Sequence, residues 1–498
     1  MNETMQVGSI EETTGFDYPV GHRLVDGNPK TRGIDPPASF APLEVFQDEH
    51  HESYQERDND NTAANHHHHI GSARTPWYGT TIVLLSEVMG TGVLSLPFAA
   101  RTLGWAWTVL AVPVFAIVAA YSGWLLARVK FEFKAFGSYA DATDTLLGPR
   151  LGKFTKICML VNWGATAIYY LIALSDGIGD LLYGKLSCDY QRSLIAIMIL
   201  VLPSQCRDFY NISKFLSAPS TMAILVLLAI VMIRLLQDND LHESENNNDK
   251  LPFGYSTTFG PLPGTNLFDF LQAMSAFVFA YQGQSIYLEL MSEMKDARQF
   301  PRACNLAYTF MSFIYGFTIL VAYGMKGIDT PEFLPDSVPA GVARRIAGAL
   351  VVLHITVSYV IACQPLHNWL HCTIFPQTYQ EESTLGSIHW FLLTVGYLMI
   401  GFVIGNLIPF FADVQALIGS LFGAPIVFGW PAAFYLALHR RNTHSWSEAA
   451  TCMGYGNLII CSIFLFVCTP LFCLLGTTGA IQSIIQDSKE AVKPFQCY

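Results

Sequence analysis

The chain has 498 residues, of which 52% are hydrophobic and only 13% are charged, whereas a soluble protein carries roughly 25% charged residues. The net charge of −11 is concentrated in residues 1–75, which hold 13 acidic and 5 basic residues. The composition argues against a set of soluble domains, and the sign of the charge argues against a tail that binds nucleic acid or anionic lipid.

Residues 1–75 are rich in Asp, Glu, Asn, Gly and Pro and show no apolar period. Such a segment buries too little apolar surface to offset its chain entropy, so we predict a disordered acidic tail. It contains no apolar stretch of the kind that a cleaved signal peptide needs. The run His66–His69 is either a natural low-complexity patch or an artificial tag, and nothing around it fixes a geometry for metal binding.

From Trp77 onward, apolar residues come in blocks of about 20, the length of helix that crosses a bilayer core. The sequence therefore predicts an all-α integral membrane domain over residues 76–485, followed by a short C-terminal tail, 486–498. Eleven spanning helices are expected, at residues 77–101, 103–128, 157–183, 192–209, 214–236, 266–290, 303–325, 344–370, 388–411, 415–438 and 453–475.

Basic residues orient these helices, because Lys and Arg favour cytoplasmic loops. The most basic loop lies between helices 2 and 3 and contains Lys130, Lys134, Arg150, Lys153 and Lys156. A cytoplasmic N-terminus places this loop in the cytoplasm, and an odd number of helices places the C-terminus on the other side. Cys188 and Cys497 then share the non-cytoplasmic side, where a disulfide between them would be compatible with the topology.

Glycines interrupt two of the predicted helices near the middle of the membrane. Helix 1 contains Gly90-Thr91-Gly92-Val93, and helix 6 contains Tyr281-Gln282-Gly283-Gln284. Glycine costs a helix about 1 kcal/mol relative to alanine, and unwound backbone is tolerated in a membrane only where it lines a cavity or packs in protein. Freed N–H groups would bind a carboxylate, and freed carbonyls suit an ammonium group or a cation. The two breaks therefore match both ends of an amino-acid zwitterion.

The interrupted helices are the first members of two sets of five, helices 1–5 and 6–10. Matching interruptions in the two halves of a chain are the best sequence indication of a transporter site. A second interpretation is that Gly90 and Gly92 only allow close helix packing, as small-x-x-x-small patterns do. No convincing sequence repeat is found between the halves.

Carboxyl groups inside the predicted helices are a second signal, because they are costly in lipid and usually functional. Glu87 lies three residues before Gly90. It is either a proton carrier or a carboxyl group satisfied by a neighbouring helix or water. Glu289 and Glu293 end helix 6 and favour a cytoplasmic gate or an ion-pair cluster over a substrate site.

The remaining ionisable residues in the helices point to no enzyme. Asp176 and Asp180 are expected to face water at the outer end of helix 3, and His354 is more typical of a satisfied core histidine than of a proton relay. His367 and His371 share a helix face, but a membrane di-iron enzyme needs several such clusters. The chain also has no nucleophile elbow and no phosphate-binding loop, so we predict that it is not an enzyme.

Several segments together resemble one family of membrane proteins. Helix 1 continues from Gly90 to Ala99 and then to Leu103-Gly104-Trp105, and helix 6 carries Phe279-Ala280-Tyr281-Gln282-Gly283-Gln284 with Leu288-Glu289 and Phe300-Pro301. Shorter matches are Ser138-Tyr139-Ala140-Asp141, Leu147-Gly148-Pro149-Arg150, Leu202-Pro203-Ser204 with Arg207-Asp208, and Ile408-Pro409-Phe410-Phe411-Ala412-Asp413. The chain resembles the amino acid/auxin permease family over about residues 75–485.

The resemblance implies eleven helices, a cytoplasmic N-terminus and the five-plus-five inverted repeat of leucine-transporter-type proteins, with helices 1 and 6 broken. It implies secondary transport of amino acids by alternating access, without a cofactor, driven by protons or in some branches by sodium. The expected partners are an amino acid and the lipid bilayer, with no nucleic acid. The residues expected to bind the substrate are Gly90, Thr91, Gly92, Val93, Tyr281, Gln282, Gly283 and Gln284.

Two departures from the family bear on the coupling ion. Ser86 stands where many members have an Asn linked to sodium in some branches, and Glu87 stands where a small neutral residue is usual. We therefore favour protons, with Ser86, Glu87 and Glu289 as the candidate coupling residues. The alternatives are sodium coupling and an amino-acid sensor that signals through its tail. The membrane is expected to be the plasma membrane or a vacuolar or lysosomal-type membrane.

Overall fold

A computed structural model describes residues 75–490 except 134–135, 184, 187, 208, 246–255, 380–382 and 409. Side chains within two stretches of one helix, 209–214 and 238–245, are not described either. The predicted acidic tail, apart from Thr75, lies outside the described residues, and so does most of the predicted C-terminal tail. Within the described part, every regular element is a helix.

Eight helical segments of the described chain are long and apolar enough to cross a bilayer. They are Leu96–Glu132, Pro149–Leu181, Phe215–Gln237, Ala297–Asp329, Val342–Ile374, Thr384–Leu407, Phe411–Arg441 and Tyr455–Lys489. The protein is therefore an all-helical membrane protein.

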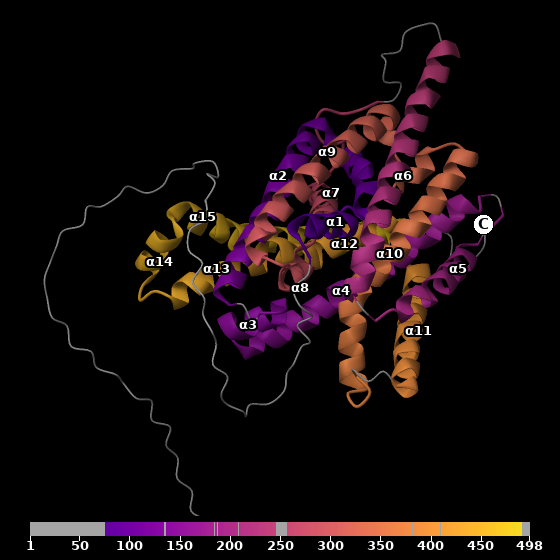
Figure 1. The fold of residues 1–498 in the computed structure, drawn as a ribbon. Helices are drawn as coiled ribbons and strands as arrows, with labels where there is room; N and C mark the ends of the chain where they lie inside the picture. The colour runs from indigo at the N-terminus through magenta and orange to yellow at the C-terminus, as the bar shows by residue number, and fades with distance from the viewer. Residues whose placement is uncertain are drawn as a thin grey trace, which may run out of the picture. The chain divides into compact units, whose positions relative to one another are not determined.

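The first half of the chain folds into six α-helices with short 3₁₀ turns between them (Figure 1). They are α1 (Trp77–Val88), α2 (Leu96–Glu132), α3 (Tyr139–Leu147), α4 (Pro149–Leu181), α5 (Asp189–Val201) and α6 (Phe209–Glu245). Ser138 caps α3, and its hydroxyl accepts the N–H of Asp141 at 3.2 Å while the Asp141 carboxylate accepts the N–H of Ser138 at 3.1 Å. The predicted third helix starts at residue 157, whereas α4 starts at Pro149, which suits the first helical turn because it lacks an N–H.

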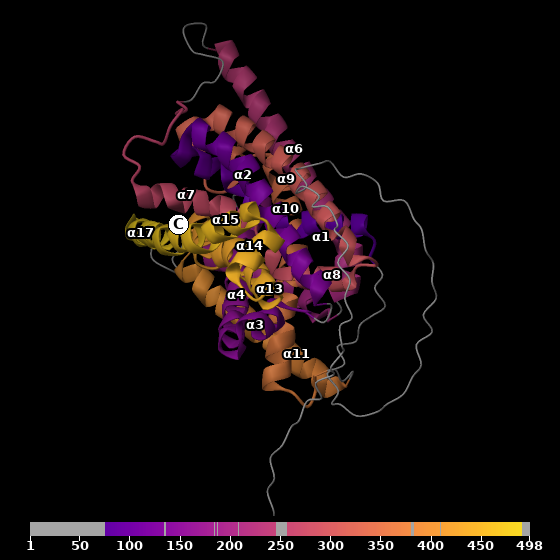
Figure 2. The same ribbon diagram turned by 90° about the vertical axis from the view of Figure 1, so that its left-hand side faces the viewer.

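The second half contains the remaining helices, several of them divided by irregular turns. They are α7 (Leu267–Ala280), α8 (Tyr287–Glu293), α9 (Phe300–Lys326), α10 (Val342–Ile374), α11 (Thr384–Leu407), α12 (Phe411–Ile418), α13 (Trp430–Arg441), α14 (Trp446–Met453), α15 (Tyr455–Ile463), α16 (Thr469–Leu471) and α17 (Thr477–Glu490). The segment from α15 to α17 is the most peripheral, since only 17% of its apolar window is buried in the protein. Figure 2 shows α13, α14 and α15 following one another on the same side of the bundle.

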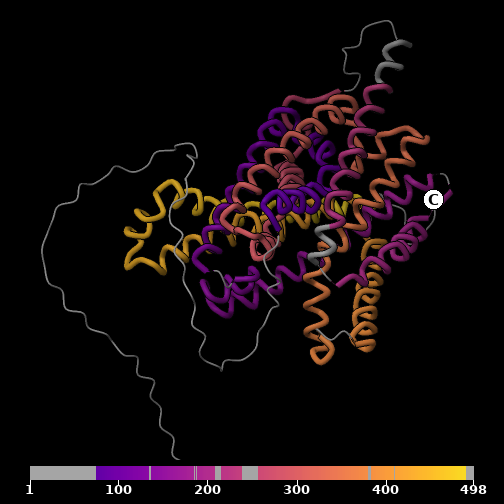
Figure 3. The backbone as a smooth tube through the Cα atoms, in the orientation of Figure 1, coloured from indigo at the N-terminus to yellow at the C-terminus, as the bar shows by residue number. Residues whose placement is uncertain are grey.

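Gly104 divides α2 into two helical pieces, close to the boundary that the sequence predicts near residue 102. Its φ of 71° lies in the left-handed region, and a side chain there would meet the Gly260 carbonyl oxygen at 2.0 Å. The loop before α7 covers this turn, because Trp105 and Ala106 donate their N–H groups to the carbonyls of Thr258 and Phe259. The helix is therefore divided at Gly104, and Figure 3 shows the course of the whole chain trace.

The interior forms where α10 packs on α4 and α6, and where α2 packs on α7 and α9. Small residues allow the closest approach, since a methyl group on Gly348 of α10 would lie 2.5 Å from the Leu181 nitrogen at the end of α4. Cys188, at the start of α5, takes part in a disulfide, and its proposed partner Cys497 lies outside the described residues.

Candidate functional site

The first break lies between α1 and α2. Helix α1 ends at Val88, Gly90 has non-helical dihedrals (φ −66°, ψ −140°), and a short 3₁₀ turn, Thr91–Leu94, precedes α2. A methyl group on Gly92 would lie only 2.8 Å from the Ala280 Cα. Glycine is thus needed here because the first break packs directly on the backbone of α7.

The second break lies between α7 and α8. Helix α7 ends at Ala280, and the chain resumes as a 3₁₀ turn, Gln284–Ile286, followed by α8. The Gly283 N–H donates to the Gln284 side chain at 2.9 Å, and a methyl group on Gly283 would lie 2.4 Å from the Val88 side chain. The two broken helices therefore touch each other at Gly92 and again at Gly283.

Tyrosines on α9 satisfy carbonyl groups that the two breaks leave outside regular helix bonding. The Tyr315 hydroxyl donates to the Val88 carbonyl at 3.1 Å and lies 3.0 Å from the Ala280 carbonyl. The Tyr308 hydroxyl lies 3.1 Å from the Tyr281 carbonyl. One hydroxyl on a neighbouring helix thus joins both broken helices, in keeping with the rule that buried backbone groups are paired.

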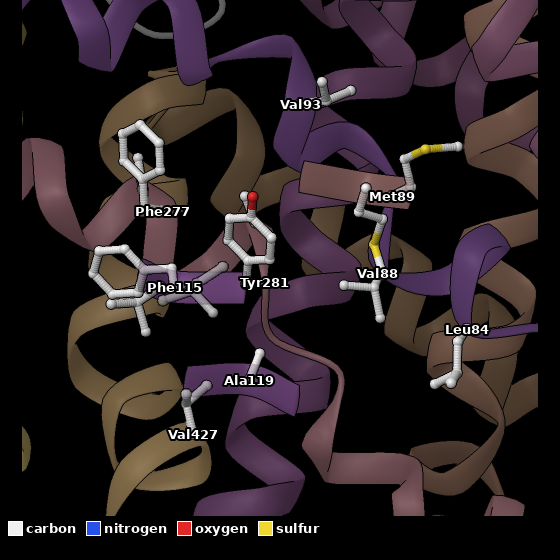
Figure 4. Close-up of a cluster of buried hydrophobic side chains, with 14 of the residues drawn as sticks. Leu84, Val88, Met89, Val93, Phe115, Ala119, Phe277, Tyr281 and Val427 are labelled. Carbon is white, nitrogen blue, oxygen red and sulfur yellow. The ribbon is translucent and has the colours of Figure 1, made fainter. Parts of the chain in front are cut away.

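Figure 4 shows the apolar packing around the breaks, with Tyr281 between Phe277 and Phe115 on one side and Val88 and Met89 on the other. The Tyr281 ring lies edge-to-face on Tyr315, with 5.0 Å between ring centroids. These rings hold the breaks in one conformation.

A narrow cavity of about 40 Å³ lies beside the two breaks. A single water needs about 10–15 Å³ by this measure, so the cavity has room for only a few water molecules and is too small for an amino acid in this conformation. Its lining comes from both breaks, α4 and α10, and consists of Glu87, Val88, Gly90, Thr91, Gly92, Asn162, Trp163, Thr166, Tyr170, Phe279, Gln282, Gly283, Ser285, Ile286 and Ala362.

Six of the eleven residues predicted for the site line this cavity: Glu87, Gly90, Thr91, Gly92, Gln282 and Gly283. The other five do not. Ser86, Val93 and Tyr281 are buried in the packing around the breaks, and the Gln284 side chain turns back to the Gly283 N–H. Glu289 lies on α8, beyond the second break.

Polar atoms in the cavity lack partners. The Gln282 amide donates to the Asn162 side chain at 3.0 Å, but Glu87 Oε2, Thr91 Oγ1, Trp163 Nε1 and Gln282 Oε1 have no hydrogen bond within the described residues. Buried polar groups are normally paired, so this arrangement is suited to a polar ligand. Glu87 is the one acidic or basic residue among the described residues of the lining.

Glu289 lies near the end of the bundle that carries α3. Lys130 and Asp141 act on it electrostatically, and the Lys130 ammonium donates to the Ser292 hydroxyl at 2.8 Å and to the Phe136 carbonyl. Lys130, Glu289 and Ser292 thus form a polar cluster, and none of the three lines the cavity.

The same end of the bundle is tied by backbone contacts. The Thr75 N–H donates to the Glu293 carbonyl at 3.1 Å, and the Lys295 N–H donates to the Thr75 carbonyl at 3.0 Å. The Arg302 guanidinium lies 4.8 Å from the Trp77 ring centroid. The beginning of α1 and the end of α8 are therefore joined at this end.

The prediction that Asp180 faces water is wrong. Asp180 is 2% exposed and accepts a hydrogen bond from the Arg344 guanidinium at 2.7 Å, because α10 packs closely on the end of α4. Arg344 also pairs with Asp336 in the loop before α10. In the same loop, burial raises the pKa of Glu332, although its carboxylate accepts the Ala412 N–H at 3.3 Å.

The histidine pair on α10 has ordinary packing partners. The His367 ring lies edge-to-face on Trp390 and Tyr397, and His371 Nε2 lies 3.2 Å from the Thr378 hydroxyl. Within the described chain, no group of three or more His, Cys, Asp or Glu residues could hold a metal ion.

The contribution of α4 was missed by sequence reasoning. Asn162, Thr166 and Tyr170 follow one another at helical spacing and place polar atoms toward the breaks. A polar stripe within an otherwise apolar span was the signal that could have identified them. Tyr315 carried no such signal, because a tyrosine in a membrane helix is unremarkable without knowledge of its neighbours.

Comparison with known proteins agrees with this geometry. A family model described as transmembrane amino acid transporter protein matches residues 73–482. Amino acid transporter AVT1C of Arabidopsis thaliana is 22% identical over 84% of this chain and 72% of its own length. Lysine histidine transporter-like 1 of the same organism is 22% identical over 92% of this chain and 98% of its own length.

Among solved structures, MhsT in complex with L-phenylalanine superposes with a TM-score of 0.53 at 13% identity, covering 81% of this chain and 98% of MhsT. At this identity the match shows the fold alone, which is of the leucine-transporter type. The family match spans most of the described chain and both broken helices. The chain therefore belongs to the transmembrane amino acid transporter family, and it is an amino acid transporter rather than an enzyme.

Proposed function

We propose that this protein is a secondary transporter that couples amino acid movement to protons by alternating access. The observation that carries the proposal is the cavity at the two touching breaks, which contains one carboxyl group, Glu87, and no basic residue within the described lining. A charged group in lipid is costly unless it is paired or neutralised. A proton on Glu87 would neutralise it, and so would the ammonium group of a substrate.

The proposed topology has eleven crossings arranged as a five-plus-five inverted repeat. Eight described segments meet the length and hydropathy needed to span. The other three crossings would be α1 with the first part of α2, α5, and α7 with α8, which are too short or too interrupted to qualify alone. The long part of α2 would then be helix 2, and the two breaks would fall in helices 1 and 6.

The proposed substrate contacts follow from the polarity of the broken backbone. The N–H groups at Thr91, Gly92 and Val93 begin a new helical turn, where a carboxylate is favoured. The substrate ammonium would lie toward Glu87 and the carbonyl groups of the breaks. Asn162 and Gln282, which are hydrogen-bonded to each other, would contact the substrate side chain.

Tyr315 supports protons over sodium as the coupling ion. In transporters with discontinuous helices, unwound carbonyls commonly coordinate the ion. Here the carbonyls of Val88 and Ala280 already lie within hydrogen-bond distance of a hydroxyl group, and a donor in that place leaves less room for a cation. Ser86 offers a hydroxyl near the same break, and its oxygen has no partner within the described residues.

The proposed orientation has a cytoplasmic N-terminal tail, with the α3 end of the bundle in the cytoplasm. The cluster of Lys130, Glu289 and Ser292 would then close the cytoplasmic side. The membrane would be the plasma membrane or a vacuolar or lysosomal-type membrane.

Replacing Glu87 with Gln tests the coupling. Uptake of a radiolabelled L-amino acid mixture into proteoliposomes is measured at two external pH values, with sodium and with choline. We expect wild-type uptake to be higher at the acidic external pH, by a factor of about 5–150, and to be the same with sodium as with choline. Glu87→Gln should lose most of this dependence on pH. Glu448→Gln, at an exposed position on α14, is the control and should behave as wild type.

Two results would contradict the proposal. Sodium-dependent uptake that ignores pH would indicate the sodium-coupled alternative. Binding of the labelled amino acids without flux in the same vesicles would indicate a sensor that signals through its tail.

A further inference from the structure

His354 on α10 is fully buried, and its Nδ1 atom lies against Ser220 of α6. Nδ1 is 2.8 Å from the Ser220 hydroxyl and 3.1 Å from the Ser220 carbonyl oxygen. A carbonyl oxygen can only accept, so its contact with Nδ1 is made by the neutral tautomer that carries its proton on Nδ1, and the Ser220 hydroxyl accepts from the same N–H. In this tautomer Nε2 carries a free lone pair, which can accept a proton.

His354 Nε2 lies beside the first break. A methyl group on Gly90 would lie 3.6 Å from His354 Nε2, 3.7 Å from the Tyr170 hydroxyl and 3.4 Å from the Glu87 carbonyl oxygen. Nε2 has no hydrogen-bond partner within the described residues. The three groups thus converge on Gly90 from three helices, α10, α4 and α1.

The helices around His354 bring few titratable groups to it. Helix α1 brings Glu87, and α4 brings Tyr170, which also lines the cavity. From the described part of α6 come Ser220 and its hydroxyl neighbours Ser217 and Thr221, with no charged side chain beside the ring.

The charged groups of the other packed elements lie nearer the helix ends. On α4, Asp176 and Asp180 lie six and ten residues beyond Tyr170. Asp180 and Asp336, in the loop before α10, pair with Arg344, ten residues before His354. Arg192 of α5 pairs with Asp189, and α11 contributes His389, which contacts Thr378. No cation of the described residues therefore opposes a positive charge on His354 at the break.

We propose that His354 Nε2 is a second binding site for the transported proton, linked to Glu87 through the Tyr170 hydroxyl. This inference rests on the proposed proton coupling. The transfer requires the Tyr170 hydroxyl to move into hydrogen-bond contact with both groups, since Nε2 has no partner in this conformation. The O–H bond of the Glu87 carboxyl then breaks and its proton goes to the Tyr170 oxygen, while the Tyr170 hydroxyl proton forms the N–H bond at Nε2. The products are a Glu87 carboxylate and a His354 imidazolium, so charge and protons balance.

This transfer explains how substrate and proton are linked. The carboxylate left on Glu87 faces the cavity, where a substrate ammonium stabilises it by opposite charge. Substrate binding therefore favours movement of the proton to His354, and a proton on His354 favours substrate binding by the same factor. The imidazolium can donate from Nε2 toward the Glu87 carbonyl, which also lies beside Gly90, and this would draw the end of α1 toward α10.

His354→Gln tests the proposal, with His367→Gln as the matched control. Both histidines are buried on α10 and have a free Nε2, but His367 packs on Trp390 and Tyr397 away from the breaks. Proteoliposomes receive the radiolabelled L-amino acid mixture in two assays: uptake driven by an imposed proton gradient, and exchange against unlabelled amino acids without a gradient.

We expect His354→Gln to lower gradient-driven uptake by about tenfold or more and to flatten its pH profile, while exchange falls far less. His367→Gln should keep both activities and the wild-type pH profile. If His354→Gln keeps the wild-type pH profile, the inference is overturned although proton coupling stands. If the wild-type protein itself gains nothing from a proton gradient, the proposed function fails instead.

A second variant covers the case in which His354→Gln does not fold. Tyr170→Phe removes the linking hydroxyl and leaves the ring in place. Gradient-driven uptake should fall more than exchange does, and equal retention of both would refute the link through Tyr170.

Discussion

Replacing Gly92 with valine is expected to abolish amino acid uptake while the protein still folds into the membrane. The first atom of any side chain at this position would lie 2.8 Å from the Ala280 Cα and 3.1 Å from its Cβ. Those atoms belong to the end of α7, which cannot move away without displacing the second break. Overpacking of this kind costs about 1–3 kcal/mol, and it separates the two backbones that form the cavity.

Gly396→Val is the matched control for this experiment. Gly396 lies in α11, and a methyl group placed on it has no atom within 4 Å. Uptake per amount of monodisperse purified protein should be near wild type for Gly396→Val and at background for Gly92→Val. Comparable uptake by the two variants would mean that contact between the breaks is not needed for transport.

Replacing Tyr315 with phenylalanine should impair transport and lower thermal stability together. The hydroxyl lies within 3.1 Å of the carbonyls of Val88 and Ala280, and phenylalanine leaves both without this donor in a buried place. A buried acceptor without a partner costs about 1–3 kcal/mol. The two carbonyls belong to different broken helices, so phenylalanine also removes the one hydroxyl group that contacts both. We therefore expect uptake to fall by about tenfold.

Tyr323→Phe separates this effect from a general loss of hydroxyl groups on α9. The Tyr323 hydroxyl accepts the Thr258 N–H at 2.9 Å, in the loop before α7 and away from the breaks. Uptake should stay near wild type in Tyr323→Phe, and the midpoint of thermal unfolding should fall less than in Tyr315→Phe. Equal losses in the two variants would remove the special role of Tyr315. If added sodium restores uptake by the Tyr315→Phe variant, a cation can take the place of the hydroxyl group.

Local sequence was enough to locate both breaks. Gly90 and Gly92 weaken a helix wherever they stand, and the amides around Gly283 compete with regular backbone bonding, so these signals do not depend on the rest of the fold. The predicted helix ends were less accurate, as α4 shows by starting at Pro149 rather than 157. The first turns of α4 are polar, so a search for apolar residues misses them although they are helical.

Side-chain direction could not be predicted in the same way. Val93 and Tyr281 lie in the breaks but face the packed interior, whereas Gln282 and Gly283 beside them line the cavity. An irregular backbone has no fixed period, so neighbouring residues can point to any side. Asp180 shows the related difficulty that a carboxylate at a helix end looks solvent-exposed until the partner helix brings Arg344 to it.

The amino acid sequence by itself determined the membrane class, the approximate position of the apolar spans, and the two places where helices break. These properties follow from composition and from the backbone preferences of single residues, which act within one or two turns of helix. Only the tertiary structure decided which groups meet at the breaks: the Tyr315 hydroxyl, the polar side of α4 and the free nitrogen of His354. Their partners lie far away in the chain, and crossing helices bring them together through packing that no local pattern encodes.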